Sequence, residues 1–447
     1  MRLAMIGAGG FRTPLVYRSL LNDHKPGRVE ELRLFDISEH RLNAMVRVMK
    51  RQARSHFDAP KLVVCSSLAQ AVDGADFVFS AIRVGGTHGR AADERIGLDN
   101  GVIGQETVGA GGIAYALRTI PVAREMAATI ERKAPNAWVI NFTNPAGVIT
   151  QAMAEIVGER VIGICDSPVG LARHALGALG LRDTGDVSLD YLGLNHLGWL
   201  RELYVNGEPR MASLLADDER LTSFEEGKLF GARWLQNLGA LPNEYLYYYY
   251  FTREQLAADQ HADEPRGAYL ARQQHEFYEC FHHEVSDPLD VWERARLDRE
   301  ETYMATNREA AGGFDRAEDD LESGGYDRVA LALMRALSRD EETRLILNVP
   351  NHGTIPTLAD DDIIEMPVRV SSGGIERLPV SPLGLAEVSL VGAVKACERE
   401  ALRAAREKSY RAAWKAYALH PLIDSAAVGK TLLDDYIRAH DGLAYLA

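Results

Sequence analysis

Two places in the chain carry residues that could together hold a metal ion. Apolar residues 161–164 predict a short buried strand, and Cys165 and Asp166 follow at its carboxyl end. Further along, His196 stands among turn residues in the run 193–199. A thiolate and an imidazole suit a borderline-soft divalent metal and leave positions open for substrate oxygens. Taken singly, such a cysteine is most often a small core residue and such a histidine a structural turn residue.

A nucleotide-binding pattern stands at the start of the sequence. Apolar residues 3–6 lead into a glycine turn, a helix-compatible stretch follows, and residues 31–36 predict a second strand that ends in an acid, Asp36. In this order the turn lets the backbone approach a pyrophosphate, and the acid can hold ribose hydroxyls. Arg12 stands where the usual motif has its third glycine, and a glycine turn in another α/β sheet is the alternative. The predicted loop residues are Gly7, Gly9, Gly10, Phe11 and Arg12.

The elements that would position these residues alternate between strand and helix. Strand-like runs at 62–65, 76–82, 138–142 and 161–164 are separated by helical sequence, which favours a parallel sheet covered by helices. From 189 to 205 the pattern becomes antiparallel and runs into Asn206-Gly207, a hairpin signal. We predict an α/β fold, with a Rossmann-type NAD-binding domain over 1–164 that resembles the nucleotide half of lactate and malate dehydrogenases. An α+β domain for catalysis, substrate binding and oligomerisation is predicted over 165–447.

Several polar residues in the loops have both an ordinary and a functional interpretation. Arg90 lies in a glycine-rich loop and could be a solvated charge, while Asn141 and Asn144 bracket a turn before Pro145. Residues 245–250 include five tyrosines, which favour an aromatic packing face. A tyrosine can still act as a base where a cation lowers its pKa. The charged segment 292–322 is interpreted as a solvated helix and loop.

Composition excludes several classes of protein. A formal net charge of −14 over 447 residues argues against a nucleic-acid partner, which usually requires a basic face. The sequence contains no run of about 18 apolar residues, so no membrane span is predicted. Four scattered cysteines suggest no disulfide framework, and the N-terminus enters a strand at once. These features predict a cytoplasmic globular protein.

Taken together, the motifs resemble those of the NAD-dependent glycoside hydrolase family 4, most closely its 6-phospho-β-glucosidases. The resemblance runs essentially end to end. It rests on residues 7–10, 83–86, 104–107, 141–145, 165–168, 193–196 and 242–246. It implies NAD and a divalent metal, often Mn²⁺, as cofactors, with Cys165 and His196 as metal ligands. It further implies that Asn144 contacts the sugar, that Arg90 and Arg266 bind a 6-phosphate, and that Tyr245 is the catalytic base.

The implied substrate is a phosphorylated disaccharide or glucoside, and the implied reaction differs from hydrolysis by two carboxylates. NAD takes a hydride from carbon 3, and the metal acidifies the proton on carbon 2. Tyr245 removes that proton, the aglycone is eliminated, water adds, and NADH returns the hydride. Members of the family are commonly dimers or tetramers, so the resemblance implies a homodimer or homotetramer.

Asp166 leaves the anomeric preference open. The β-glucosidases typically have asparagine after the metal-binding cysteine, whereas aspartate is associated with 6-phospho-α-glucosidases, where it is the proposed acid. A 6-phospho-α-glucosidase, or a related glycosidase of the same family, is therefore the alternative. An NAD-dependent 2-hydroxy acid dehydrogenase is the alternative of another class, with residues 141–145 and His196 as its polar groups.

Overall fold

The computed structural model describes residues 1–181, 185–317, 321, 325–339 and 341–447. Within these residues a single sheet of thirteen strands runs through the molecule, in the order β10-β8-β7-β12-β11-β6-β5-β4-β1-β2-β3, with β13 beside β12 and β9 beside β8. The strands of the N-terminal part are β1 (Arg2–Ile6), β2 (Glu31–Phe35), β3 (Lys61–Val64), β4 (Phe77–Ser80), β5 (Trp138–Asn141) and β6 (Val161–Gly163). All of them pair in parallel, as the alternating pattern predicts.

The remaining strands extend this sheet in antiparallel fashion. They are β7 (Val187–Leu194), β8 (Leu197–Val205), β9 (Glu208–Pro209), β10 (Leu241–Pro242), β11 (Thr343–Pro350), β12 (Ile363–Ser371) and β13 (Gly374–Arg377). The two parts join where Gly163 of β6 pairs with Asn348 of β11. The predicted hairpin at Asn206-Gly207 is confirmed, because both residues have positive φ and connect β8 to β9.

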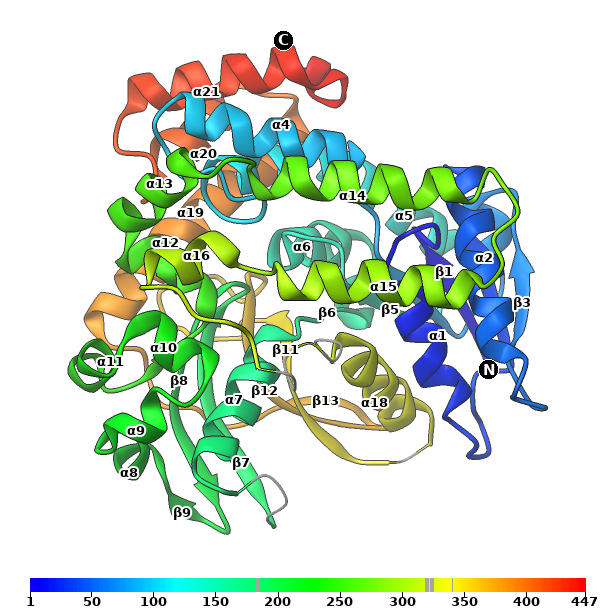
Figure 1. Ribbon diagram of the computed structural model, residues 1–447, viewed down its shortest axis with the longest axis horizontal. Helices are drawn as coiled ribbons and strands as arrows, with labels where there is room; N and C mark the ends of the chain where they lie inside the picture. The colour runs from blue at the N-terminus through cyan, green and yellow to red at the C-terminus, as the bar shows by residue number, and fades with distance from the viewer. Residues whose placement is uncertain (182–184, 318–320, 322–324, 340) are drawn as a thin grey trace.

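Helices cover both faces of the sheet. The N-terminal helices are α1 (Thr13–Leu21), α2 (Glu39–Ala53), α3 (Leu68–Val72), α4 (Gly86–Asp99), α5 (Gly109–Lys133), α6 (Ala146–Val157) with the 3₁₀ turn η1 (Gly158–Arg160), and α7 (Ser167–Ala178). Short helices follow: α8 (Met211–Leu215), α9 (Asp218–Leu221), α10 (Glu225–Phe230), α11 (Ala232–Leu238), η2 (Glu244–Leu246), α12 (Tyr247–Tyr250) and α13 (Thr252–His261). Figure 1 shows the short helices gathered at one end of the molecule.

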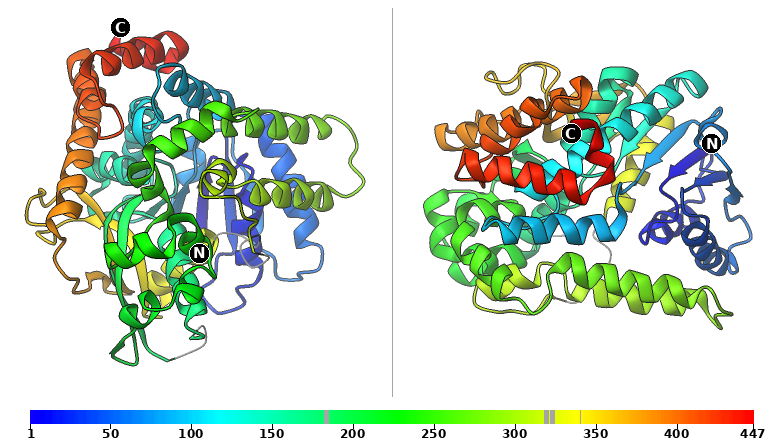
Figure 2. Two further views of the ribbon diagram at one scale, coloured as in Figure 1. Left: turned by 60° about the vertical axis from the view of Figure 1, so that its left-hand side comes forward. Right: turned by 90° about the horizontal axis from the view of Figure 1, so that it is seen from above.

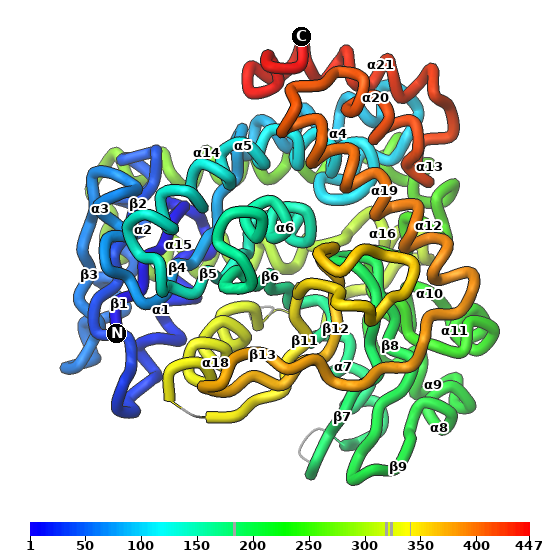
Figure 3. Tube along the Cα trace, turned by 180° about the vertical axis from the view of Figure 1, so that it is seen from behind, coloured from blue at the N-terminus to red at the C-terminus, as the bar shows by residue number. Residues whose placement is uncertain are grey.

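The remaining helices lie in the C-terminal part of the chain. They are α14 (Arg266–Cys280), α15 (Pro288–Glu301), α16 (Ala305–Ala310), α18 (Tyr326–Arg339), α19 (Leu385–Glu407), α20 (Tyr410–Ala418), α21 (Ala426–Ala439) and η3 (Asp441–Leu446). Helices α14 and α15 cross one face of the N-terminal part (Figure 1), while α5, α6 and α19 lie behind it (Figure 3). Helix α21 lies above α4 in Figure 1, and the two helices run beside each other when the molecule is seen from above (Figure 2). No helix of the described residues is long and apolar enough to span a membrane.

The core consists of two large apolar layers separated by the sheet, together with one small cluster around Tyr248. Successive residues of a strand point to opposite faces, so Leu3 and Met5 of β1 enter one layer and Ala4 and Ile6 enter the other. The first layer also holds buried residues of α1, α2, α7, α15 and α18. The second is filled by α5 and α6 together with α19, α20 and α21. Both layers therefore combine N-terminal and C-terminal sequence.

Candidate functional site

A pocket of about 430 Å³ contains most of the residues that the sequence singles out. It lies beyond the carboxyl ends of β5 and β6, where open parallel sheets bind their ligands. Its other walls come from α4, α14, α15 and the segments around η2 and α16. The predicted residues that line it are Arg12, Arg90, Asn144, Cys165, Asp166, His196, Tyr245 and Arg266.

The two predicted metal ligands meet in this pocket, and both are buried. Burial raises the pKa of the Cys165 thiol well above its usual value, and the charges of Glu365 and Asp166 raise it further. Burial also lowers the pKa of His196 to about 3, so its imidazole is neutral. A neutral imidazole and a thiol that needs a cation to ionise are a donor set suited to a divalent metal.

Hydrogen bonds determine which nitrogen of His196 is free. The side-chain oxygen Oε1 of Gln105 accepts from Val108 N at 2.8 Å and from Thr107 Oγ1 at 3.0 Å, which uses the only hydroxyl proton of Thr107. Thr107 Oγ1 must then accept from Nδ1 of His196, 3.0 Å away. The ring proton therefore sits on Nδ1 and leaves the lone pair of Nε2 available to a metal.

The backbone of His196 supports a functional role. His196 is the second residue of the two-residue loop that joins β7 to β8, because Leu194 pairs with Leu197. Its φ of 62° lies in the left-handed region that tight hairpin loops require and that glycine, asparagine and aspartate fill most easily. Next to it, Asn195 Oδ1 accepts from Ala146 N at 3.2 Å, which attaches the loop to the start of α6. Strain of this kind clusters at functional sites.

Among the tyrosines of 245–250, Tyr245 is the one that lies against the predicted metal ligand. Its ring stacks on His196 with centroids 3.7 Å apart and planes 7° from parallel. Its hydroxyl lies 3.1 Å from the hydroxyl of Tyr303. Burial raises the pKa of Tyr245 well above its usual value, and the charge of Glu244 adds to this. A cation beside the ring would lower that pKa toward the working range of a base.

The glycine loop has the geometry of a nucleotide-binding turn. Gly7 has a φ of 84°, and a Cβ there would lie 2.4 Å from the carbonyl oxygen of Ala81. Gly10 N donates to Gly7 O at 2.9 Å, which closes the turn. Asp36 accepts from Gly9 N at 2.8 Å and from Ser38 N at 2.8 Å, so its carboxylate also braces the loop.

The last two loop residues have different surroundings. The ring of Phe11 is buried against Phe277, with centroids 5.1 Å apart, so only its backbone can face a cofactor. Arg12 lines the pocket, with its guanidinium 3.8 Å from Asp166 and 3.3 Å from Glu300. The residue that replaces the third glycine thus links the nucleotide loop to the predicted metal centre.

Arginines gather at another wall of the pocket. Arg90 is buried and donates to Glu94 at 2.8 Å and to Glu106 at 2.6 Å. Arg266, at the first turn of α14, donates to the carbonyl of Arg299 at 2.8 Å. Burial lowers the pKa of Arg266 to about 10, and the positive charge of Arg90 contributes. Positive side chains held together without solvent favour an anionic ligand.

Arg299 belongs to this cluster, and sequence reasoning missed it. Burial lowers its pKa to about 9, and the positive charges of Arg12, Arg266 and Arg90 contribute. The interpretation of 292–322 as solvated is wrong for α15, because Trp292, Arg296 and Glu300 are buried. Their spacing of four residues, which puts them on one helix face, was the available signal. The side chain of Arg299 lines the pocket beside them.

The asparagines separate into two roles. Asn141 is fully buried and donates to Thr143 O at 3.1 Å and to Thr150 Oγ1 at 3.1 Å, so it holds the turn together. Asn144 precedes a cis peptide bond to Pro145 and lines the pocket. Asp166 is the residue before α7, and burial raises its pKa.

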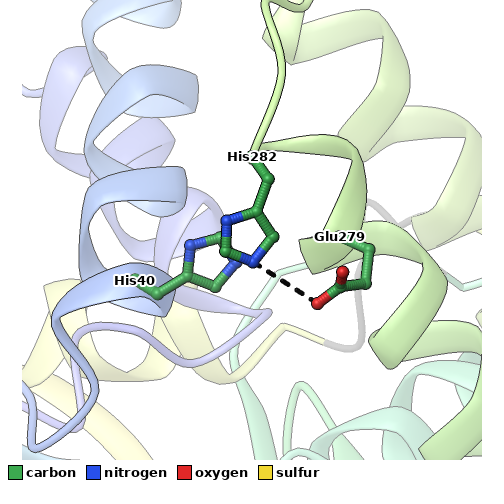
Figure 4. A group of neighbouring side chains, drawn as sticks. All are labelled: His40, Glu279 and His282. Carbon is green, nitrogen blue, oxygen red and sulfur yellow. Dashed lines mark ion pairs between the residues drawn. The ribbon is translucent and has the colours of Figure 1, made fainter.

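A further group of possible metal ligands lies outside the pocket. Potential ligand atoms of His40, Glu279 and His282 lie within 4.8 Å of one another, on α2 and at the end of α14 (Figure 4). However, the two imidazole rings are stacked at 3.9 Å and 6° from parallel, so one ion cannot lie in both ring planes. His40 Nε2 also bonds to the carbonyl of Tyr278 at 3.0 Å. These contacts attach α14 to α2, and Tyr278 in turn donates to Gly9 O at 2.7 Å.

Solved structures share this architecture over nearly the whole chain. A 6-phospho-beta glucosidase from Thermotoga maritima, solved with manganese, NAD⁺ and glucose-6-phosphate, is 29% identical with a TM-score of 0.82, covering 98% of each chain. A 6-phospho-alpha-glucosidase from gut microorganisms, in complex with NAD and glucose-6-phosphate, is 27% identical with the same TM-score of 0.82, covering 99% and 98% of the two chains. A malate dehydrogenase from Salinibacter ruber, 13% identical with a TM-score of 0.50 over 91% and 99% of the chains, shares the fold alone. The predicted fold class is confirmed.

Sequence comparison gives the same result. A probable 6-phospho-beta-glucosidase of Bacillus subtilis is 30% identical over 100% of this chain and 97% of its own length. The model of the family 4 glycosyl hydrolases matches residues 2–181, and that of their C-terminal domain matches residues 191–423. The chain therefore belongs to glycosyl hydrolase family 4.

Proposed function

We propose that this chain hydrolyses 6-phospho-β-glucosides with the help of NAD and a divalent metal, Mn²⁺ in the first instance. The observation that carries the proposal is the stacking of Tyr245 on His196 in a pocket that also holds Cys165 and a wall of arginines. A base, a metal-binding pair and an anion site thus meet in one cavity. Relatives whose names specify 6-phospho-beta-glucosidases support the substrate class.

In this proposal each residue has one task. Cys165 and His196 Nε2 hold the metal, and the glycine loop with Asp36 holds NAD. When bound, NAD accepts a hydride from carbon 3 and the metal acidifies the neighbouring carbon 2 proton. Tyr245 takes that proton and later returns it. Arg90, Arg266 and Arg299 bind the 6-phosphate, and Asn144 contacts the sugar.

A 6-phospho-α-glucosidase is the second candidate, favoured by one observation. Asp166 lines the pocket directly after Cys165, in the position that would suit an acid for the α anomer. Arg12, 3.8 Å away, favours the ionised form of Asp166, but burial outweighs this charge and raises the pKa of Asp166. We still place the β-glucoside first, because the relatives named 6-phospho-beta-glucosidases are 29–30% identical to this chain and those named 6-phospho-alpha-glucosidases are 26–27% identical.

The deciding assay compares p-nitrophenyl β- and α-glucoside 6-phosphates, each with and without NAD, Mn²⁺ and a thiol reductant. We expect faster hydrolysis of the β-glucoside, lost on removal of either NAD or the metal, with no accumulation of NADH. Hydrolysis that persists without both cofactors would sink the proposal. Stoichiometric NADH from a 2-hydroxy acid would instead support the dehydrogenase alternative.

The setting of the enzyme is part of the proposal. A sugar phosphate is charged and does not cross the apolar interior of a bilayer unaided. We therefore place the enzyme in the cytoplasm, and we retain a homodimer or homotetramer as the expected assembly. Light scattering of the purified chain tests the latter.

A further inference from the structure

Glu244 is a buried carboxyl group of the pocket to which the reaction described above gives no task. It precedes Tyr245 in the turn η2. Its Oε1 accepts from Ser167 Oγ at 2.6 Å and from the Tyr303 hydroxyl at 3.4 Å. Ser167 follows Cys165 and Asp166 in the chain, and Tyr303 bonds to Tyr245 at 3.1 Å. Glu244 is thus connected to the reacting centre from two sides.

The second oxygen of Glu244 is different from the first. Oε2 is buried and has no hydrogen-bond partner among the described residues. Burial raises the pKa of Glu244 to about 8, and the negative charge of Glu226 contributes, so the group holds a proton at neutral pH. Because Oε1 already accepts two hydrogen bonds, the proton belongs on Oε2. The protonated Oε2 of Glu244 is therefore a hydrogen-bond donor without an acceptor in the described part of the chain.

Most other acids of the pocket lie beside basic partners. Glu106 forms ion pairs with Arg90 and Arg83. Burial raises the pKa of Glu106, but the charges of the two arginines outweigh burial and lower this pKa to about 2. Asp166 lies 3.8 Å from Arg12, and Glu226 lies 2.7 Å from His174. Asp259 lacks a basic partner among the described residues, but its carboxylate accepts from Gln255 at 2.7 Å. Of these groups, Glu244 is the one beside Tyr245 with an unused donor.

We propose that Glu244 protonates the departing aglycone oxygen and, as the resulting carboxylate, deprotonates the water that adds to carbon 1. This rests on the proposed function. When Tyr245 takes the carbon 2 proton, the electron pair of the broken carbon 2–hydrogen bond forms the carbon 1–carbon 2 double bond. The carbon 1–oxygen bond breaks, and that oxygen takes the proton of Glu244. Water then bonds to carbon 1, its proton returns to Glu244, and Tyr245 returns its proton to carbon 2.

The experiment uses the dependence of the rate on the leaving group. Glu244→Gln keeps the shape of the side chain but cannot protonate an oxyanion. We measure single-turnover aglycone release from methyl and 2,4-dinitrophenyl β-glucoside 6-phosphates with bound NAD and Mn²⁺. The methoxide leaving group needs a proton, so its release should fall about 10²- to 10⁴-fold. Release of dinitrophenolate, which needs none, should fall less than about tenfold.

Deuterium exchange at carbon 2 is the second readout. Glu244→Gln should still exchange the carbon 2 proton with D₂O, because Tyr245 is intact. If Glu244→Gln slows aglycone release equally on both substrates, or abolishes the carbon 2 exchange, then Glu244 only supports the fold of the site and the proposal is overturned. It is equally overturned if Asp166→Asn shows the leaving-group dependence and Glu244→Gln does not. Absence of exchange in the wild-type enzyme would instead refute the proposed function.

Asp259→Asn is the matched control. Asp259 is a half-buried acid of the pocket whose pKa is raised to about 6 by desolvation, and it makes no hydrogen bond to Ser167 or Tyr303 among the described residues. Asp259→Asn should change the rate of aglycone release from both substrates by the same factor. A preferential loss on the methyl glucoside in this variant would mean that the effect is not specific to Glu244.

Discussion

At the scale of single residues, burial sets the protonation states that the chemistry needs. The same desolvation that lowers the pKa of His196 to about 3 raises that of Glu244 to about 8. Both groups are therefore neutral near pH 7, one with a free lone pair and the other with a free proton. Tyr245 lies between them in the hydrogen-bond and stacking network. Pairs of groups with pKa values displaced in opposite directions are typical of acid–base sites.

Tyr245→Phe tests the base at this scale. Removing the hydroxyl should reduce aglycone release by about 10²- to 10⁴-fold and abolish exchange of the carbon 2 proton with D₂O. Nuclear magnetic resonance of the recovered substrate measures the exchange. Tyr248→Phe is the control, since Tyr248 also lines the pocket but donates to Asn307 at 3.2 Å. Exchange at the wild-type rate in Tyr245→Phe would assign the base to another group.

Arg299→Gln tests the anion site. The charge of Arg299 is disfavoured where it stands, and a phosphate beside it would relieve the repulsion from Arg12 and Arg266. We expect KM for the 6-phosphorylated substrate to rise about tenfold or more, with a smaller change in kcat. The exposed Arg272→Gln, on the outer side of α14, is the control and should behave as wild type. A weaker affinity for NAD with an unchanged KM would place Arg299 at the pyrophosphate instead.

The difference between Cys165 and Arg299 shows what sequence can reveal about a site. Cys165 and the glycine loop follow strands directly, so local patterns predict both their position and their exposure to ligands. Arg299 and Glu244 reach the pocket because α15 and η2 return to it from distant parts of the chain. No local pattern fixes that return. The sequence also does not identify which of the five tyrosines at 245–250 stacks on His196, because that depends on a 3₁₀ turn that packs against the β7–β8 loop.

At the scale of elements, buried ion pairs fix helices that the pocket needs. Asp23, just after α1, accepts from Arg335 at 3.0 Å and from Arg339 at 3.0 Å, both on α18. Burial raises the pKa of Asp23, but the hydrogen bonds from the two arginines outweigh it and lower the pKa overall. Helix α1 follows the glycine loop directly, so this attachment holds the first turn of the nucleotide site against the C-terminal half.

Asp23→Asn should lower the free energy of unfolding at pH 7 by about 3–5 kcal/mol, because two arginines lose a buried partner. The folded-state pKa is depressed, so this stabilisation is present above about pH 4 and disappears as the pH falls through the lowered value. Urea unfolding at pH 7 and pH 3 measures both effects. Asp287→Asn, which breaks a half-exposed pair with Arg51, should change the stability much less than Asp23→Asn. A difference between Asp23→Asn and wild type that does not shrink as the pH falls from 7 to 3 would contradict the ionic explanation.

At the scale of the whole molecule, the two halves share one sheet and one core. The apolar layer behind β1 contains Leu117 and Ile130 of α5 together with Leu402, Tyr417 and Tyr436 of the C-terminal helices. The hydroxyl of Tyr436 donates to Asp93 O at 2.9 Å. Asp93 forms a buried ion pair with Arg118 at 2.6 Å. The division at residue 164 remains a prediction about function, while packing crosses it on both faces.

This sharing predicts how the isolated N-terminal segment behaves. Expressed alone, residues 1–164 would expose the faces of α5 and α6 that α19, α20 and α21 cover, and would leave β6 as an unpaired edge. We expect no cooperative urea transition and weak near-ultraviolet circular dichroism, because the fragment lacks half of one apolar layer. Co-expression with residues 165–447 should restore both signals and NAD binding. A fragment that unfolds cooperatively and binds NAD alone would show that the parallel strands and their own helices suffice for a stable nucleotide domain.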